Sequence, residues 1–135
     1  MTAKIVYQGA LRTAATHVQS NTTIETDAPT DNQGKGERFS PTDLVATALG
    51  SCMMTIMGIK ARDMQIDLTG TTISIQKHML ADPRRIGAVD VIFEFPAGLQ
   101  LQEKERQILE NAARTCPVAK SIHPDIEQRV VFNWP

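Results

Sequence analysis

One long apolar segment with a strong helix start constrains this chain most. Ser40 precedes Pro41, and Asp43 follows three residues after Ser40. This order supplies a capping hydroxyl, a proline in the first turn and an acid near the positive end of a helix. The apolar residues that follow recur at helical spacing for about four turns; they are Leu44, Val45, Ala48, Leu49, Cys52, Met53, Ile56, Met57 and Ile59. The pattern predicts a helix over about residues 41–62 at the centre of the fold.

Short β-rich runs lie on both sides of this helix. Three runs before it, residues 4–8, 12–18 and 22–26, predict a meander of short strands. After the helix the pattern predicts a strand hairpin, a second helix, a short helix and a last strand, over residues 67–80 and 85–95, 101–115, 118–122 and 126–134. Strand hairpins separated by helices predict an α+β fold with a largely antiparallel sheet.

Length and composition limit the classes of protein to which the chain can belong. A chain of 135 residues buries about two thirds of its unfolded surface, so we expect a single domain over residues 1–135 with its own core. The net charge is −1 and aromatic residues make up 4%, which argues against nucleic-acid binding and against anionic membranes. The long helix is apolar over more of its circumference than one small sheet covers, so we expect a second chain to cover the rest.

No secretory or membrane-spanning segment is predicted. The N-terminal run turns polar at Gln8, and the apolar stretch 44–59 contains three hydroxyl residues. That stretch is also shorter than the roughly 20 residues that span a bilayer. We therefore expect a cytoplasmic protein whose two cysteines do not form a permanent structural bridge.

The two cysteines are the main candidates for chemistry. Cys52 lies on the apolar stripe of the long helix, where an inert core thiol is the alternative interpretation. Cys116 precedes Pro117 at a junction between helices. As the N-cap of a short helix its sulfur would face unpaired N–H groups, which lower the pKa of a thiol. From this chemistry alone Cys116 is the better nucleophile. The alternative interpretation is that Cys116 is a turn residue that takes part in no reaction.

Two thiols on core helices are the minimum set for reversible thiol redox chemistry. A thiolate needs a cation, and Arg12, Arg38 and Arg114 are the candidates, because the planar guanidinium can hold a thiolate and a peroxide oxygen together. The three histidines are scattered, and no spacing typical of metal ligands or of a phosphate loop occurs. We expect neither a metal nor another cofactor.

Two motifs of the chain together resemble those of a known family. The stretch FSPTDLVATALGSC at residues 39–52, followed 64 residues after Cys52 by Cys116-Pro117-Val118, resembles the OsmC/Ohr family of osmotically inducible and organic-hydroperoxide-resistance proteins. The resemblance covers essentially the whole chain. It implies an OsmC-like fold with antiparallel sheets around two long central helices, in an intertwined homodimer with active sites at the dimer interface.

The resemblance also implies roles for individual residues. By position, Cys52 is the peroxidatic cysteine, which an organic hydroperoxide oxidises to a sulfenic acid, and Cys116 then closes a disulfide. This reverses the choice of nucleophile made from chemistry alone. A dithiol such as a reduced lipoyl protein restores the pair, and Arg12 fits the arginine that holds the thiolate. The apolar side chains expected to line a funnel for organic peroxides are Leu49, Met53 and Met57.

One position departs from the family pattern. Efficient peroxidases of the family carry Glu directly after the helix-start proline, where this chain has Thr42, and its acid comes one residue later at Asp43. Asp43 points about 100° away around the helix and is more typical of a capping residue. We therefore expect the arginine–glutamate pairing to be absent, with Thr42, Asp43 and Arg38 beside the site, as in the broader OsmC-like branch.

Two other functions remain open at this point. The first is a non-catalytic member that binds an apolar ligand at the dimer interface, which the missing glutamate and four methionines at positions 53, 54, 57 and 64 favour. The second is a structural protein with two inert thiols.

Overall fold

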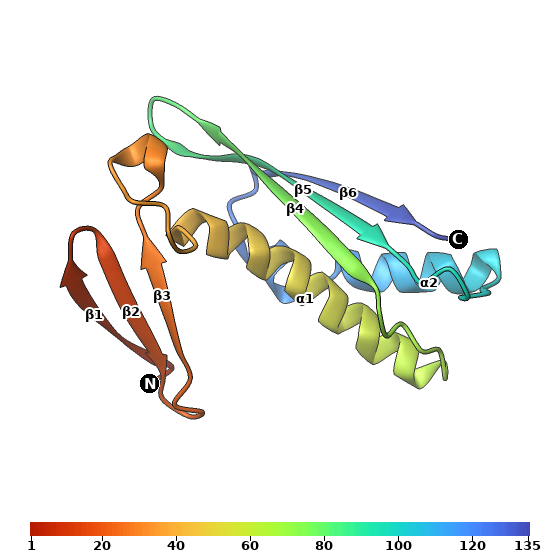
Figure 1. Cartoon of the computed structure of the whole chain (residues 1–135). Helices are drawn as coiled ribbons and strands as arrows, with labels where there is room; N and C mark the ends of the chain where they lie inside the picture. Colours follow the sequence, from red (N-terminus) through yellow and green to blue (C-terminus); the bar gives the residue numbers. More distant parts are fainter. The chain divides into compact units, whose positions relative to one another are not determined.

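The computed structural model describes all 135 residues, and these form two compact units, residues 1–45 and 46–135 (Figure 1). The boundary falls in the first turns of the long helix α1 (Pro41–Asp63). The expected single domain over residues 1–135 stays a prediction.

Unit 1 (residues 1–45) is built on a three-stranded antiparallel sheet. The strands β1 (Ala3–Gly9), β2 (Arg12–His17) and β3 (Thr23–Asp27) pair in the order β1-β2-β3, which confirms the predicted meander. A 3-10 turn, η1 (Thr30–Asn32), follows the sheet. The buried residues of this unit are all polar; they are Thr26, Asp27 and Ser40. Unit 1 therefore has no apolar core within one chain.

The turn between β1 and β2 has an unusual backbone. Ala10 and Leu11 both adopt left-handed conformations, with φ of 50° and 63°, which costs about 1–2 kcal/mol for a residue with a Cβ atom. The Leu11 N–H donates to the Tyr7 hydroxyl at 3.3 Å, and the Ala28 N–H donates to the Leu11 carbonyl at 3.1 Å. These bonds hold the turn that leads directly into Arg12.

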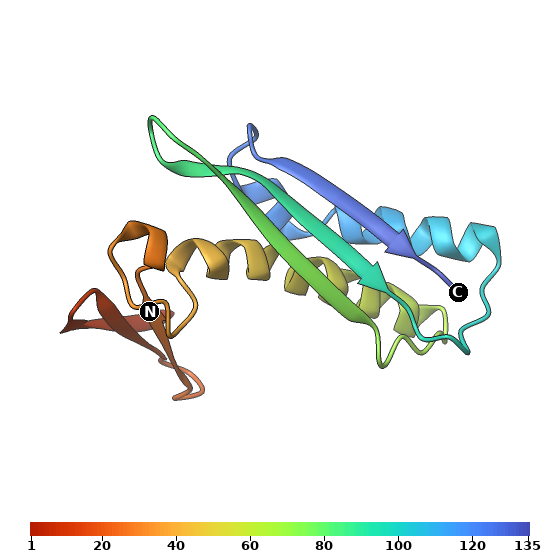
Figure 2. The ribbon, with the colours of Figure 1, turned by 45° about the horizontal axis from the view of Figure 1, so that its top comes forward.

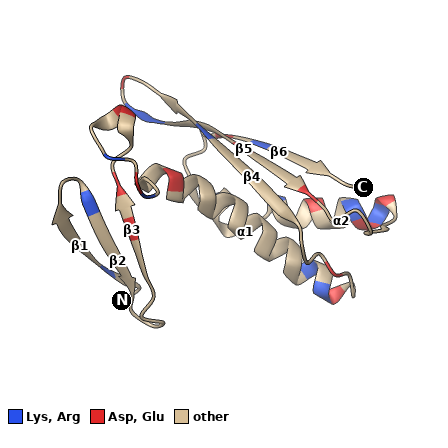
Figure 3. Ribbon diagram, in the orientation of Figure 1, with Lys and Arg blue, Asp and Glu red and all other residues tan.

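Helix α1 begins with the predicted capping box. The Asp43 N–H donates to Ser40 Oγ at 3.0 Å, and the Ser40 N–H donates to Asp43 Oδ2 at 2.8 Å, so two N–H groups of the first turn are satisfied. Between Asp43 and Lys60 the helix carries no charged residue (Figure 3). The helix ends at Asp63, close to the expected residue 62, and Gln65 follows with a left-handed φ of 58°.

Unit 2 (residues 46–135) contains a mixed sheet; this corrects the fully antiparallel sheets implied by the resemblance, while the largely antiparallel pattern predicted from the sequence holds for the other strand pairs. Strands β4 (Thr72–Leu80) and β5 (Arg85–Glu94) form the predicted antiparallel hairpin, but β6 (Glu127–Asn133) pairs with β5 in parallel. The 32-residue connection 95–126 contains helices α2 (Glu103–Arg114) and α3 (Pro117–Ser121). A crossover of this length returns the chain to the same end of the sheet, which makes parallel pairing accessible.

Two further details of unit 2 differ from the expectation. Residues 67–71 form a turn rather than strand, because Asp67 Oδ1 accepts from the Thr69 N–H at 2.9 Å and Leu68 C=O accepts from the Thr71 N–H at 3.1 Å. The chain has one long helix, α1 with 23 residues, while α2 has only 12. Helix α2 stops there because Cys116-Pro117 begins a new helix.

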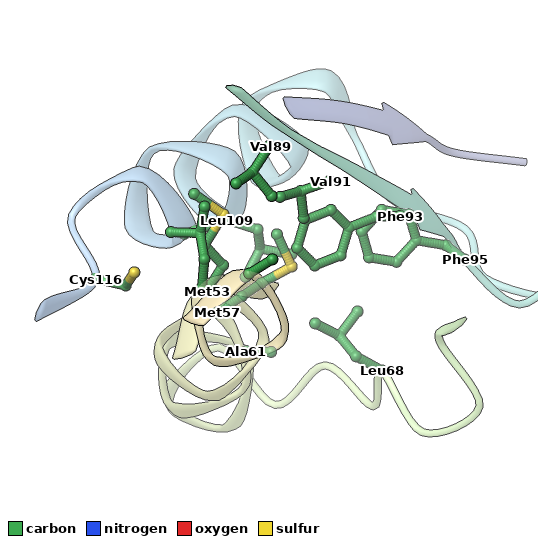
Figure 4. Close-up of a cluster of buried hydrophobic side chains, with 13 residues drawn as sticks. Met53, Met57, Ala61, Leu68, Val89, Val91, Phe93, Phe95, Leu109 and Cys116 are labelled. Atoms are coloured by element: carbon green, nitrogen blue, oxygen red, sulfur yellow. The ribbon is translucent and has the colours of Figure 1, made fainter. Parts of the chain in front are cut away.

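The core of unit 2 lies between the sheet and the two helices. Both α1 and α2 lie on the same side of β4-β5-β6 (Figures 1 and 2). Gly50 lets α1 approach β4 closely, since a Cβ atom there would lie 2.5 Å from Ile75 Cδ1. The buried cluster (Figure 4) comprises Ala46, Leu49, Met53, Met57, Ala61, Leu68, Val89, Val91, Phe93, Phe95, Leu109, Ala113 and Cys116.

Helix α1 leaves part of its apolar surface uncovered. Val45 and Ile59 are 40% and 46% exposed, and Cys52 and Ile56 are only partly buried. By length and composition alone α1 could cross a membrane, but core helices pass the same test, and here Leu49, Met53 and Met57 are fully buried against the sheet and α2.

Candidate functional site

Cys52 lies in the middle of α1, at the edge of the core of unit 2. Helical spacing places it next to the buried stripe, and its side chain is partly buried against the cluster that contains Cys116. Its thiol is free. Cys52 is thus packed against apolar neighbours on one side and partly exposed on the other, unlike a fully enclosed core cysteine.

Cys116 is the N-cap of α3, as predicted. Its Sγ accepts from the Ala119 N–H at 3.2 Å, and Pro117 occupies the first helical position. The residue is 0% exposed. Burial raises the pKa of the Cys116 thiol, and the hydrogen bond from Ala119 opposes this only in part. The expectation that the cap position lowers its pKa is therefore wrong, because desolvation of the thiolate outweighs the helix N-terminus.

The fold brings the two thiols together within unit 2. Cys52 packs against the buried cluster that contains Cys116, and its proximity contributes, after burial, to the raised pKa of Cys116. Sixty-four residues separate the two cysteines in sequence. Because the Cys116 thiol lies near Cys52, a Cys52 sulfur that has been oxidised can be attacked by Cys116 to form a disulfide.

Arg12 is held in unit 1 by two carboxylates. Its Nε and Nη2 donate to the two oxygens of Asp27 at 2.7 and 2.9 Å, and Nη2 also donates to Glu37 Oε2 at 2.8 Å. None of these bonds uses Nη1. The bidentate pair with Arg12 holds the pKa of Asp27 below its usual range. The Arg12 side chain is one-quarter exposed, at 24%.

The expected absence of the family's pairing between the arginine and a helix-start glutamate stays a prediction, but Arg12 does pair with a different glutamate. Position 42 is indeed not acidic, but Glu37, from the loop after β3, pairs with Arg12 instead. Asp27 and Glu37 are residues that the sequence interpretation missed. The meander carried a signal for Asp27, because the antiparallel register of β2 and β3 places Arg12 opposite Asp27.

The remaining polar candidates have structural partners. Asp43 completes the capping box, and Thr42 Oγ1 lies 3.1 Å from Ser40 Oγ. Arg38 Nε donates to Glu25 Oε2 at 2.8 Å. In unit 2 the Arg114 guanidinium lies 5.3 Å from the centroid of the Phe132 ring.

The proposed substrate-lining residues Leu49, Met53 and Met57 are all in the core, with at most 1% exposed (Figure 4). A separate open cavity of about 590 Å³ lies at the end of α1 in unit 2. Its apolar walls include Met54, Ala61, Ile66 and Leu68. Met54 thus lines this cavity, whereas Met53 and Met57 lie buried in the core.

No group of three or more potential metal ligands occurs in the structure. His17 bonds to Ser20, and His78 Nε2 lies 2.7 Å from Asp90 Oδ2 on β5. His123 pairs loosely with Asp125 at 3.8 Å. The histidines therefore lie apart, in agreement with their scattered positions in the sequence.

An α+β fold with two three-stranded sheets and a pair of adjoining free thiols defines the class of protein. Residues 34–130 match the family described as OsmC-like protein. The chain belongs to the OsmC-like family. This family includes cysteine-based hydroperoxide peroxidases, and its members are typically dimers that act on hydroperoxides.

Solved structures agree with this assignment. A protein from Psychrobacter arcticus, named for osmotic stress induction and a detoxification response, is 59% identical with a TM-score of 0.94, over 98% of this chain and 96% of that one. More distant structures share the fold. The organic hydroperoxide resistance protein OsmC of Legionella pneumophila is 17% identical (TM-score 0.76, 98% and 95% covered). An organic hydroperoxide resistance protein of Elizabethkingia anophelis is 16% identical (TM-score 0.75, 100% and 97% covered). No curated protein matches the chain.

Proposed function

We propose that the protein is a thiol-dependent peroxidase that reduces organic hydroperoxides in an oxidative stress response. The observation that carries this proposal is the packing of Cys52 against the buried cluster that contains Cys116, the only other cysteine of the chain. A peroxidase of this type needs one sulfur that a substrate can approach and a second sulfur within reach of the first. Cys52 is the partly exposed member and Cys116 the buried one.

The reaction follows from these two positions. The Cys52 thiolate attacks the terminal oxygen of the hydroperoxide, so that a sulfur–oxygen bond forms, the oxygen–oxygen bond breaks and an alcohol leaves with a proton. Cys116 then attacks the sulfenic acid, forms the disulfide and releases water. A dithiol, such as a reduced lipoyl protein, supplies two electrons and two protons to restore both thiols.

Arg12 is the cation proposed for the Cys52 thiolate. Its Asp27 and Glu37 bonds fix the guanidinium while leaving Nη1 outside that network. The apolar neighbours of Cys52 favour organic hydroperoxides over hydrogen peroxide, because an alkyl group gains from leaving water and hydrogen peroxide does not. Leu49, Met53 and Met57 stay proposed substrate contacts, for which core side chains would have to move.

A homodimer is part of the proposal. The β1 residues Ile5, Val6 and Tyr7 are at least 63% exposed, and α1 leaves Val45 and Ile59 open. Exposed apolar surface of this kind marks an interface. We propose that a second copy of the chain covers both the sheet of unit 1 and the open apolar stripe of α1. Sedimentation at micromolar concentration should give twice the mass of 14.9 kDa; a monomer would contradict this part. We propose the cytoplasm as its compartment.

The test is consumption of tert-butyl hydroperoxide with a dithiol reductant, in the wild type and in Cys52→Ser. Turnover should be lost in the variant and should be slower for hydrogen peroxide in the wild type. Equal turnover in the wild type and in Cys52→Ser would refute the peroxidase function.

The cavity beside Met54 favours one alternative, a non-catalytic protein that binds an apolar ligand. Intact mass after mild peroxide treatment distinguishes the two functions. A loss of two hydrogens in the wild type but not in Cys116→Ser supports the peroxidase and argues against pure binding.

A further inference from the structure

The two sulfurs differ in how they can be approached from outside. Cys116 is 0% exposed, and the side chains that enclose it belong to the core of the same unit. A partner copy or a ligand can add to this cover but cannot remove it. Cys52 is only partly buried. A disulfide between them therefore joins a fully buried residue to one that is only partly buried.

Thiol–disulfide exchange depends on this difference. The incoming thiolate attacks one sulfur while the other sulfur leaves with the bonding electron pair, so the rate depends on which sulfur can be reached. Attack on Cys116 would require the core around α3 to open first, whereas attack on Cys52 would not.

We propose that the reductant which regenerates the oxidised protein attacks the Cys52 sulfur, and that Cys116 is the leaving thiol. This inference rests on the proposed function. The reductant's first thiolate forms a sulfur–sulfur bond to Cys52, the Cys52–Cys116 bond breaks, and Cys116 takes the electron pair and a proton. The second thiol of the reductant then displaces Cys52 and closes the reductant's own disulfide, so that two electrons and two protons pass to the protein.

The surroundings of Cys116 suit a leaving thiol. The Ala119 N–H, 3.2 Å from Cys116 Sγ, donates to the sulfur on which negative charge develops, and such charge-assisted bonds are the stronger ones. Burial raises the pKa of this thiol, which slows its departure but also keeps it protonated afterwards. A protonated Cys116 does not attack the mixed disulfide again, so the reduction proceeds forward.

Peptide mapping tests which sulfur is attacked. The full-length protein is oxidised with tert-butyl hydroperoxide or, separately, with diamide, and the loss of two hydrogens is checked by mass. The monothiol N-acetylcysteamine, which has no second thiol to displace Cys52 within the mixed disulfide, is added briefly, and free thiols are blocked with N-ethylmaleimide in acid. Trypsin then separates the cysteines, because Cys52 lies in peptide 39–60 and Cys116 in peptide 115–120.

The monothiol should be found on peptide 39–60 at about tenfold or greater excess, which corresponds to about 1.4 kcal/mol for opening the core around Cys116. The same disulfide in denaturant should give both adducts, as a control. In a second measurement the single thiol of Cys116→Ser should react with a disulfide reagent about tenfold faster than that of Cys52→Ser. Adducts mainly or equally on peptide 115–120, or equal rates, would overturn the inference.

The outcomes separate the two proposals. If peroxide does not form the disulfide but diamide does, the peroxidase function fails and the mapping still decides which sulfur is attacked. If neither oxidant forms it, both proposals are overturned. If peroxide forms it and the adduct lies on Cys116, only the site of reductant attack is wrong.

Discussion

The two units of the chain are stabilised in opposite ways. Unit 2 buries a continuous apolar cluster around Phe93, while the buried side chains of unit 1 are all polar and include Asp27. Arg12, Asp27 and Glu37 form the main ion-pair network of unit 1. The thiols belong to the unit with an apolar core, and the proposed cation belongs to the unit whose buried side chains are polar.

The largest effect should come from the core of unit 2. Phe93 is 0% exposed and stacks on Phe132 at 5.0 Å between ring centroids. Phe93→Ala should lower the free energy of unfolding by about 3–5 kcal/mol, because the lost burial adds to the cavity left behind. Urea denaturation measures this. The control Val131→Ala, 46% exposed on β6, should stay within about 0.5 kcal/mol; equal losses would contradict the assignment of the core.

A smaller, pH-dependent effect should mark the polar network of unit 1. The Arg12 guanidinium lowers the pKa of Asp27 from 3.8, so the folded state favours the carboxylate more than the unfolded state does. The stabilisation that the ionised Asp27 carboxylate gives the folded state is complete above about pH 4. It is lost as the pH falls through the lowered folded-state pKa of Asp27. Asp27→Asn should therefore melt below the wild type at neutral pH, with a gap that narrows below about pH 4.

Thermal melts followed by circular dichroism across this range measure the gap. The control is Asp63→Asn, an exposed carboxylate at the end of α1, which should show no such narrowing. A gap for Asp27→Asn that stays constant, or widens, on acidification would show that the carboxylate's charge is not what stabilises unit 1.

Local signals predicted most of the elements and the pairing of strands adjacent in sequence, but not the pairing of β6 with β5. Ser40, Pro41 and Asp43 fixed the start of α1, because capping depends on residues three apart. The parallel pairing of β6 was missed, since strand patterns do not encode which strand lies alongside. Cysteine chemistry singled out Cys52 and Cys116, and the resemblance to a family assigned their expected roles, but the burial that raises the pKa of Cys116 depends on residues distant in sequence.

The cap of α3 should give an effect of intermediate size in unit 2. Cys116→Ser keeps an acceptor for the Ala119 N–H, whereas Cys116→Ala removes it. Relative to the serine variant, the alanine variant should lose about 1 kcal/mol of unfolding free energy, since capping acceptors contribute about that much. Urea denaturation under reducing conditions compares the two. Equal stability would mean that the sulfur packs in the core without capping α3.

The smallest effect should have opposite signs in the two units. Leu11 in unit 1 and Leu80 in unit 2 are equally exposed, at 46% and 47%. Leu11 has a φ of 63°, where glycine is favoured, while Leu80 lies at the end of β4. Leu11→Gly should raise the free energy of unfolding by about 0.5–1 kcal/mol, because it relieves the left-handed strain. Leu80→Gly should lower it by about the same amount, because glycine loses more backbone entropy in a strand.

Thermal melts of the pair at one protein concentration provide the measurement. A loss in both variants would mean that the Leu11 side chain is itself buried against something outside this chain, and the strained turn before Arg12 would then be part of an interface.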